Sequence, residues 1–138
     1  MLTIERTATA SVAAAPERCL ERLADVGAYP SWASLIRSAE LAEGRVRLVA
    51  ELLGVAFVMD CDLELAAGSA MLRRIPYSDD DEEGFEATWT VTPADGGGSL
   101  VELRVEAALD APGPARFVRG RIEKRLVDDL LADFSRSL

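Results

Sequence analysis

Polar and apolar residues alternate along most of this chain, and the alternation predicts β-strands. From Thr3 to Val12, Ile4, Ala8, Ala10 and Val12 occupy one parity, and polar residues occupy the other. Six further strands are predicted, and turn residues separate most of them. They are Ser38–Ala42, Arg45–Leu53, Ala56–Leu65, Ala70–Tyr77, Phe85–Pro93 and Ser99–Leu109. Neighbouring strands should be antiparallel, because a parallel crossover needs about a dozen residues.

Three of these segments show which face should be buried. The inward rows are Val55, Phe57, Met59, Cys61, Leu63 and Leu65, then Phe85, Ala87, Trp89 and Val91, then Val101, Leu103, Val105, Ala107 and Leu109. The opposite parity carries mainly charged residues and threonine. One face of the predicted sheet is therefore in water.

Helical spacing appears in three places. A first short helix opens at Pro16 and stops by Gly27, and a second covers Tyr29–Leu35. A long amphipathic helix of about 24 residues is expected from Pro114 to Leu138. Its apolar stripe is Val118, Ile122, Leu126, Leu130, Phe134 and Leu138. On an ideal α-helix, residues four apart are offset by about 40° around the helix axis, so this stripe cannot stay on one face. The helix therefore either bends, with Gly120 as the weak point, or wraps a twisted sheet.

Together these elements predict one α+β domain over residues 1–138. A curved antiparallel sheet of about seven strands should wrap around the long C-terminal helix, with two short helices after the first strand. A sheet curled around one helix often encloses a cavity. The fold therefore points to ligand binding.

Composition narrows the function classes. The chain has 138 residues, of which 49% are hydrophobic, and a formal net charge of -9, which argues against binding nucleic acid. Cys19 and Cys61 are expected to be reduced core residues, and neither a metal nor a cofactor is expected. No segment is apolar enough to span a bilayer and no signal peptide is recognisable, so a cytoplasmic protein is expected. Transient membrane contact stays open, as does the choice between a monomer and a weak homodimer.

Four segments carry a resemblance to a known family, and they are Ala15-Pro16-Glu17, Tyr29-Pro30-Ser31-Trp32, Trp89-Thr90-Val91-Thr92-Pro93 and Gly120-Arg121-Ile122-Glu123. In this order they resemble the START-like superfamily, also called SRPBCC or birch-pollen-allergen-like, and within it the bacterial polyketide cyclase/dehydrase and coenzyme Q-binding group. The resemblance implies a helix-grip fold whose cavity takes lipids, quinones or polyketides. The chain departs from the cyclase pattern because it has no histidine and because the inward positions Cys61 and Leu63 carry no basic or hydroxylated group.

Candidate ligand-binding residues come from the apolar inward rows, the second short helix and the front of the last helix. They are Trp32, Leu35, Phe57, Met59, Cys61, Met71, Ile75, Phe85, Trp89, Phe117, Gly120 and Arg121. The alternative is that the apolar members form a filled core. Tyr29 and Trp32 either cap the cavity mouth or pack the short helices onto the sheet.

Catalytic candidates are Arg73, Tyr77 and Tyr29. Arg73 and Tyr77 share the parity of Met71 and Ile75, so Arg73 would meet a ligand carbonyl or carboxylate if that parity faces inward. The alternative is that the parity of Arg74 faces inward, since a register error of one residue reverses every side chain.

The acidic run Asp79–Glu83 lacks the ligand spacing of a calcium loop and is read as a solvated loop. It should lie at the same end of the sheet as the start of the last helix. We therefore expect it to attract the basic residues there, which are Arg116, Arg119, Arg121, Lys124 and Arg125, across the cavity mouth. The front of the helix, Phe117–Ile122, is expected to control access of the ligand.

Three functions remain open at this point. The first is a carrier or sensor of a small hydrophobic molecule without turnover. The second is an enzyme of the cyclase/dehydratase type, acting on a polyketide-like chain without a metal or nucleotide cofactor. The third is a protein-interaction module whose cavity is filled.

Overall fold

A computed structural model describes residues 1–110 and 113–138, except for the side chains of residues 115 and 116. The strands are β1 (Leu2–Val12), β2 (Ile36–Ala42), β3 (Arg45–Leu52), β4 (Val55–Ala66), β5 (Ser69–Arg74), β6 (Gly84–Pro93) and β7 (Ser99–Leu109). The helices are α1 (Pro16–Ala24), α2 (Tyr29–Trp32), α3 (Arg119–Glu123) and α4 (Leu130–Ser137). Short 3₁₀ segments cover Val26–Ala28, Asp95–Gly97 and Gly113–Val118, and a π-helical segment covers Lys124–Asp129.

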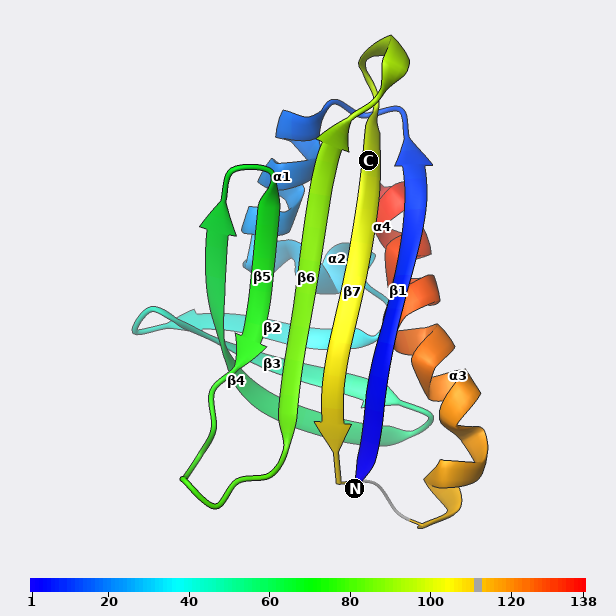
Figure 1. The fold of residues 1–138 in the computed structure, drawn as a ribbon. Coiled ribbons are helices and arrows are strands. Elements are labelled where there is room, and N and C mark those ends of the chain that lie inside the picture. Colours follow the sequence, from blue (N-terminus) through cyan, green and yellow to red (C-terminus); the bar gives the residue numbers. More distant parts are fainter. Residues whose placement is uncertain (111–112) are drawn as a thin grey trace.

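The strands form one seven-stranded antiparallel sheet in the order β1-β7-β6-β5-β4-β3-β2. The sheet curves strongly, so that β2 and β3 cross behind the upright strands β5, β6, β7 and β1 (Figure 1). Helices α1 and α2 and the C-terminal helical segment lie on the same side of the sheet (Figure 1). The predicted helix-grip architecture, including the two short helices after the first strand, is confirmed.

The inward row of β7 is buried over its whole length, and in β6 Ala87, Trp89 and Val91 are buried. The predicted row of β4 is only partly right. Met59 and Cys61 are buried, but Val55 and Leu65 at its two ends are 41% and 56% exposed. Burial is greatest in the middle of this twelve-residue strand and falls toward both ends, as expected for a long strand of a strongly twisted sheet.

The C-terminal segment is less uniform than the predicted single helix. Its start, Gly113–Val118, is 3₁₀, and the helix from Arg119 to Ser137 contains the π-helical stretch. A π turn closes i→i+5 hydrogen bonds and is therefore wider than an α turn. The wider turn offsets the drift of a four-residue stripe, so Ile122, Leu126, Leu130 and Phe134 all remain buried. The irregularity lies after Gly120, which is itself inside α3.

Candidate functional site

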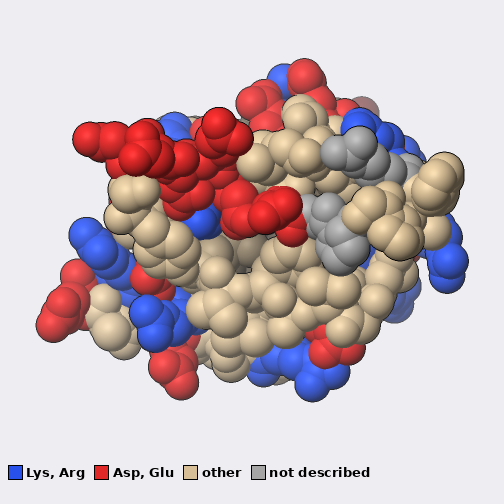
Figure 2. Space-filling model, turned by 90° about the horizontal axis from the view of Figure 1, so that it is seen from below, with Lys and Arg blue, Asp and Glu red and all other residues tan. Residues whose placement is uncertain are grey.

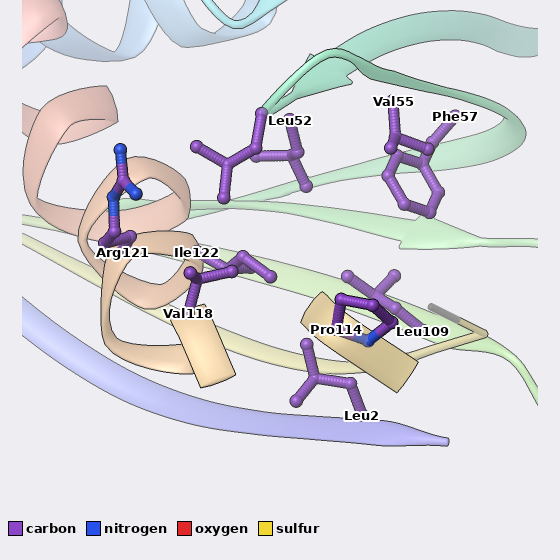
Figure 3. Close-up of a pocket in the computed structure, with 10 residues that line it drawn as sticks. Leu2, Leu52, Val55, Phe57, Leu109, Pro114, Val118, Arg121 and Ile122 are labelled. Atoms are coloured by element: carbon purple, nitrogen blue, oxygen red, sulfur yellow. The ribbon is translucent and has the colours of Figure 1, made fainter. Parts of the chain in front are cut away.

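A pocket of about 550 Å³ opens at the end of the molecule where the β3–β4 hairpin meets the start of the C-terminal helical segment. Figure 3 shows Leu52, Val55 and Phe57 of the hairpin facing Pro114, Val118 and Ile122 across this space. The lining residues are Leu2, Leu52, Leu53, Val55, Phe57, Leu109, Pro114, Val118, Arg121 and Ile122. We call this space the mouth. Nine of the ten described residues that line it are apolar.

The turn of the β3–β4 hairpin has a leucine, Leu53, at a position where asparagine, aspartate or glycine is usual. Leu53 and Gly54 connect β3 to β4 with φ angles of 49° and 82°. Two successive positive φ angles define a type I′ turn, for which Asn-Gly is the favoured sequence. An L-residue with a full side chain in this region costs about 1–2 kcal/mol. Leu53 is nevertheless there, 48% exposed, and its side chain borders the mouth.

A second, inner cavity of about 40 Å³ lies deeper between the sheet and the helices. Leu52, Phe57 and Leu109 line both the mouth and the inner cavity, so the two spaces adjoin. The other residues around the inner cavity are Tyr29, Trp32, Leu35, Ile36, Leu48, Ala50, Met59, Leu72, Phe85, Ala87, Trp89, Leu126 and Leu130. In this conformation the inner cavity admits only a small group.

Four aromatic side chains meet at the inner end. The ring centroid of Trp32 lies 5.1 Å from Tyr29, 5.4 Å from Phe134 and 6.2 Å from Trp89, all in edge-on geometry. Tyr29 and Trp32 thus pack the short helix α2 onto the sheet and helix α4, and they do not cap the mouth. The Nε1 atom of Trp32 is buried and has no hydrogen-bond partner among the described residues.

The three catalytic candidates lie apart. The Tyr29 hydroxyl donates to the Leu23 carbonyl at 2.6 Å, and burial raises the pKa of this phenol. Tyr77 is 61% exposed, with its ring 4.9 Å from the Arg74 guanidinium. Arg73 is exposed and its Nε lies 3.1 Å from Glu86 Oε2. The parity of Ala70, Leu72 and Arg74 faces inward, so the hypothesis of an inward Arg73 is wrong.

Arg74 holds the loop between β5 and β6. Its side chain is 6% exposed, its Nη2 atom lies 2.8 Å from Asp81 Oδ2, and its Nη1 donates to the Glu83 carbonyl at 2.9 Å. Asp81 also accepts the backbone N–H groups of Tyr77 and Glu83. These bonds, first that from Tyr77 and then that from Arg74, hold the pKa of the Asp81 carboxyl below its ordinary value.

Three of the basic residues at the start of the last helix have partners outside the acidic loop, and Arg121 has no hydrogen-bond or ion-pair partner among the described residues. Arg119 donates to the Thr3 carbonyl at 2.5 Å, Lys124 pairs with Asp129 at 2.6 Å, and Arg125 donates to Ser34 at 2.9 Å. The side chain of Arg116 lies outside the described residues. The predicted attraction across the mouth is therefore absent from the part of the chain that the structure describes, because Asp81 and Glu83 turn back to Arg74.

The proposed ligand-binding residues divide into two groups. Those that line the inner cavity or the mouth are Trp32, Leu35, Phe57, Met59, Phe85, Trp89 and Arg121. Those that line neither are Cys61, Met71, Ile75, Phe117 and Gly120. Cys61 is fully buried, and burial raises the pKa of its thiol to about 12. Phe117 is 92% exposed.

Sequence reasoning missed most of the mouth. Eight of its described lining residues were not among the candidates: Leu2, Leu52, Leu53, Val55, Leu109, Pro114, Val118 and Ile122. One signal was present: the apolar run Leu52-Leu53 directly before Gly54, where a hairpin turn in water usually carries polar residues. Among the described residues, no group of His, Cys, Asp or Glu is placed to hold a metal ion, and no helix is long and apolar enough to cross a membrane.

Comparisons with known proteins bear on the family and the fold of this chain. A family model described as "Polyketide cyclase / dehydrase and lipid transport" matches residues 3–138. No curated protein sequence matches the chain.

Solved structures share the fold at low sequence identity. A START superfamily protein from Mycobacterium smegmatis has a TM-score of 0.76 at 20% identity, covering 96% of this chain and 95% of its own. The Zhui aromatase/cyclase from a Streptomyces species has a TM-score of 0.73 at 19% identity, with 99% and 94% covered. A protein from Thermus thermophilus has a TM-score of 0.76 at 23% identity, with 96% and 95% covered.

Proposed function

The chain belongs to the polyketide cyclase/dehydrase and lipid transport family, and we propose that it binds a small hydrophobic molecule between its sheet and its C-terminal helix, as a carrier or sensor without turnover. The ligand would be lipid-, quinone- or polyketide-like. Its body would occupy the mouth, and a narrow end would reach the inner cavity.

The observation that carries this proposal is the continuous apolar wall from the mouth inward. The mouth, at about 550 Å³, falls in the range of about 300–1,000 Å³ that is typical of small-molecule pockets. Burial of apolar surface contributes about 25 cal/mol per Å², so a ligand that covers this wall gains affinity without specific polar contacts.

The apolar lining of the mouth and the inner cavity also argues against catalytic turnover of the ligand. General acid–base catalysis needs a proton donor or acceptor within about 3 Å of the reacting atom. Among the described residues that line the mouth and the inner cavity, Arg121 is the single charged side chain, and the one hydroxyl, on Tyr29, is engaged by the Leu23 carbonyl. Neither cysteine lines either space. The site can bind and shield a ligand but offers no acid–base pair.

Access would be controlled where the 3₁₀ segment Gly113–Val118 faces the hairpin. A 3₁₀ turn has poorer hydrogen-bond geometry than an α turn, so this segment opens at lower cost than the helix behind it. Pro114 and Val118 belong to this segment and line the mouth. Movement of a few residues would therefore widen the pocket without unfolding the core.

A cyclase/dehydratase activity is the second candidate, because the family description names it and the Zhui aromatase/cyclase shares the fold. It is tested by incubating the protein with a poly-β-ketone mimic. We expect binding without acceleration of cyclisation. Acceleration that depends on Arg121 or Tyr29 would favour the enzyme.

The direct experiment on binding is native mass spectrometry of freshly purified protein, followed by solvent extraction. A co-purifying apolar molecule, released on unfolding, is the expected result. A protein that is purified without a bound molecule and takes up no added apolar probe would contradict the proposal and favour a protein-interaction module. Cytoplasmic action is proposed as the setting, in line with two buried cysteines that are both free thiols.

A further inference from the structure

We propose that the ligand carries a carboxylate, and that Arg121 binds this group at the rim of the mouth while the apolar body of the ligand fills the pocket. The inference rests on the proposed binding function and adds a chemical class to it. The preferred ligand would be an amphipathic monoanion, such as a fatty acid or a similar apolar acid.

Arg121 is the one charged side chain among ten described residues around the mouth. It lies on α3, and Figure 3 shows it beside Val118 and Ile122, at the side of the pocket away from Val55 and Phe57. The side chain is exposed, so a ligand can bring a charged group to it without removing that group from water. An apolar molecule seated in the mouth would thus place its outer end near a guanidinium.

The neighbouring cations whose side chains the structure describes are already engaged. Arg119 donates to the Thr3 carbonyl, Lys124 to Asp129 and Arg125 to the Ser34 hydroxyl. Arg121, in contrast, makes no side-chain hydrogen bond or ion pair with any residue that the structure describes. Its five N–H donors therefore remain available for a ligand.

The chemistry of a single guanidinium favours a carboxylate. Its planar fork matches the two oxygens of a carboxylate in a bidentate arrangement. A dianionic phosphate is better served by several cations, and the other nine described residues that line the mouth are apolar. The apolar wall also limits water on one flank of the pair, which strengthens the electrostatic attraction.

The net charge of -9 does not oppose this placement. Exposed charges more than about 8 Å apart are largely screened at physiological salt, so the cation at the rim dominates its own surroundings. Viewed from this end, acidic side chains gather at one side with basic side chains beside them, and an uncharged surface extends from there to further basic side chains at the opposite edge (Figure 2). Both signs of charge are thus present at this end.

The test compares decanoic acid with decanol by calorimetry at pH 7.5 and about 0.15 M salt. The two probes share the chain and differ in the head group. We expect decanoate to bind the wild-type protein about ten-fold more tightly than decanol. The preference should disappear as the pH falls through the pKa of the acid, about 4–5.

Variants locate the effect. Arg121→Gln should weaken decanoate binding about ten-fold and change decanol binding by less than about two-fold. Arg119→Gln is the matched control, because it removes a nearby exposed arginine that does not line the mouth, and it should leave the ratio of the two affinities unchanged. Arg121→Glu should make decanol the preferred probe.

The outcomes separate the two proposals. Equal binding of acid and alcohol by the wild-type protein, or a preference that survives Arg121→Gln, would overturn the carboxylate assignment and leave the binding function standing. Failure of both probes to bind would overturn both. Because the acid–alcohol comparison uses the wild-type protein, it does not depend on any variant folding.

Discussion

Arg74 and Asp81 form a nearly buried ion pair, with Nη2 and Oδ2 2.8 Å apart and side-chain exposures of 6% and 12%. The pair fixes the β5–β6 loop to the inward face of β5. Arg74 therefore anchors the acidic run at Asp81 and Glu83. The other three acidic residues, Asp79, Asp80 and Glu82, are exposed to solvent.

Asp81→Asn should release this loop. The amides of Tyr77 and Glu83, which donate to Asp81, should lose hydrogen-exchange protection at neutral pH. In the wild-type protein, bonds from Tyr77 and Arg74 keep the pKa of Asp81 below its ordinary value of 3.8. The stabilisation is thus complete above that value and is lost as the pH falls through the lowered pKa. Asp80→Asn is the control, and equal loss of protection in both variants would contradict the pairing.

Leu53→Asn should raise the stability of the protein and lower its affinity for an apolar ligand. Asparagine tolerates positive φ better than leucine, which recovers about 1 kcal/mol, while the mouth loses an apolar wall residue. Thermal unfolding and calorimetry with decanol measure the two effects.

A matched control exists at the other hairpin. Glu43 also has a positive φ, 53°, before a glycine, and Glu43→Asn should stabilise to a similar extent without any effect on binding. Undiminished affinity in Leu53→Asn would show that the hairpin tip is not part of the site.

Phe57→Ala should join the mouth to the inner cavity. The half-buried ring lines both spaces, so its removal should cost about 2 kcal/mol of unfolding free energy and shift the preferred ligand to longer chains. A series of fatty alcohols of increasing length measures the shift. Phe117→Ala is the control, because this ring is 92% exposed, and it should change stability by less than about 0.5 kcal/mol. An unchanged length optimum in Phe57→Ala would contradict the continuity of the two spaces.

Tyr29→Phe should cost about 1 kcal/mol of stability, because the hydroxyl no longer donates to the Leu23 carbonyl. Ligand affinity should stay within about two-fold, since the hydroxyl already has a protein partner. If a cyclising activity is found and this variant abolishes it, the assignment of Tyr29 to the core alone is wrong.

The sequence predicted the fold well where one parity was clearly apolar. The β7 row from Val101 to Leu109 allows only one orientation, and the structure confirms it. In β5 the two parities each hold an arginine, Arg73 in one and Arg74 in the other, so alternation alone could not choose between them. Tertiary contacts decide which parity faces inward. Arg74 pairs with Asp81 and Glu83, and Arg73 pairs with Glu86 on the outer face.

The candidate site was harder to predict than the fold. Residues of the inner cavity, such as Phe85 and Trp89, follow from the inward rows. The mouth is formed where the ends of several strands lie close together in space. Leu2 begins β1, Leu109 ends β7, and Leu53 lies in the turn between β3 and β4. The alternation of residues within a strand does not indicate which strand ends are neighbours in the fold. The π-helical stretch could not be predicted either. Its only sign in the sequence is an apolar stripe with a four-residue step that runs further along the helix than one face of an ideal α-helix allows.

The central claim is that the apolar space at the mouth is a ligand-binding site. The most direct measurement is methyl NMR of isotope-labelled Ile, Leu and Val residues during a titration with decanol, a probe that does not need Arg121. We predict saturable shifts for Leu52, Val55, Leu109, Val118 and Ile122, with little change at the exposed Val58 and Leu65, which lie outside the mouth. Absence of saturable shifts at the mouth, or shifts concentrated at Val58 and Leu65, would contradict the account.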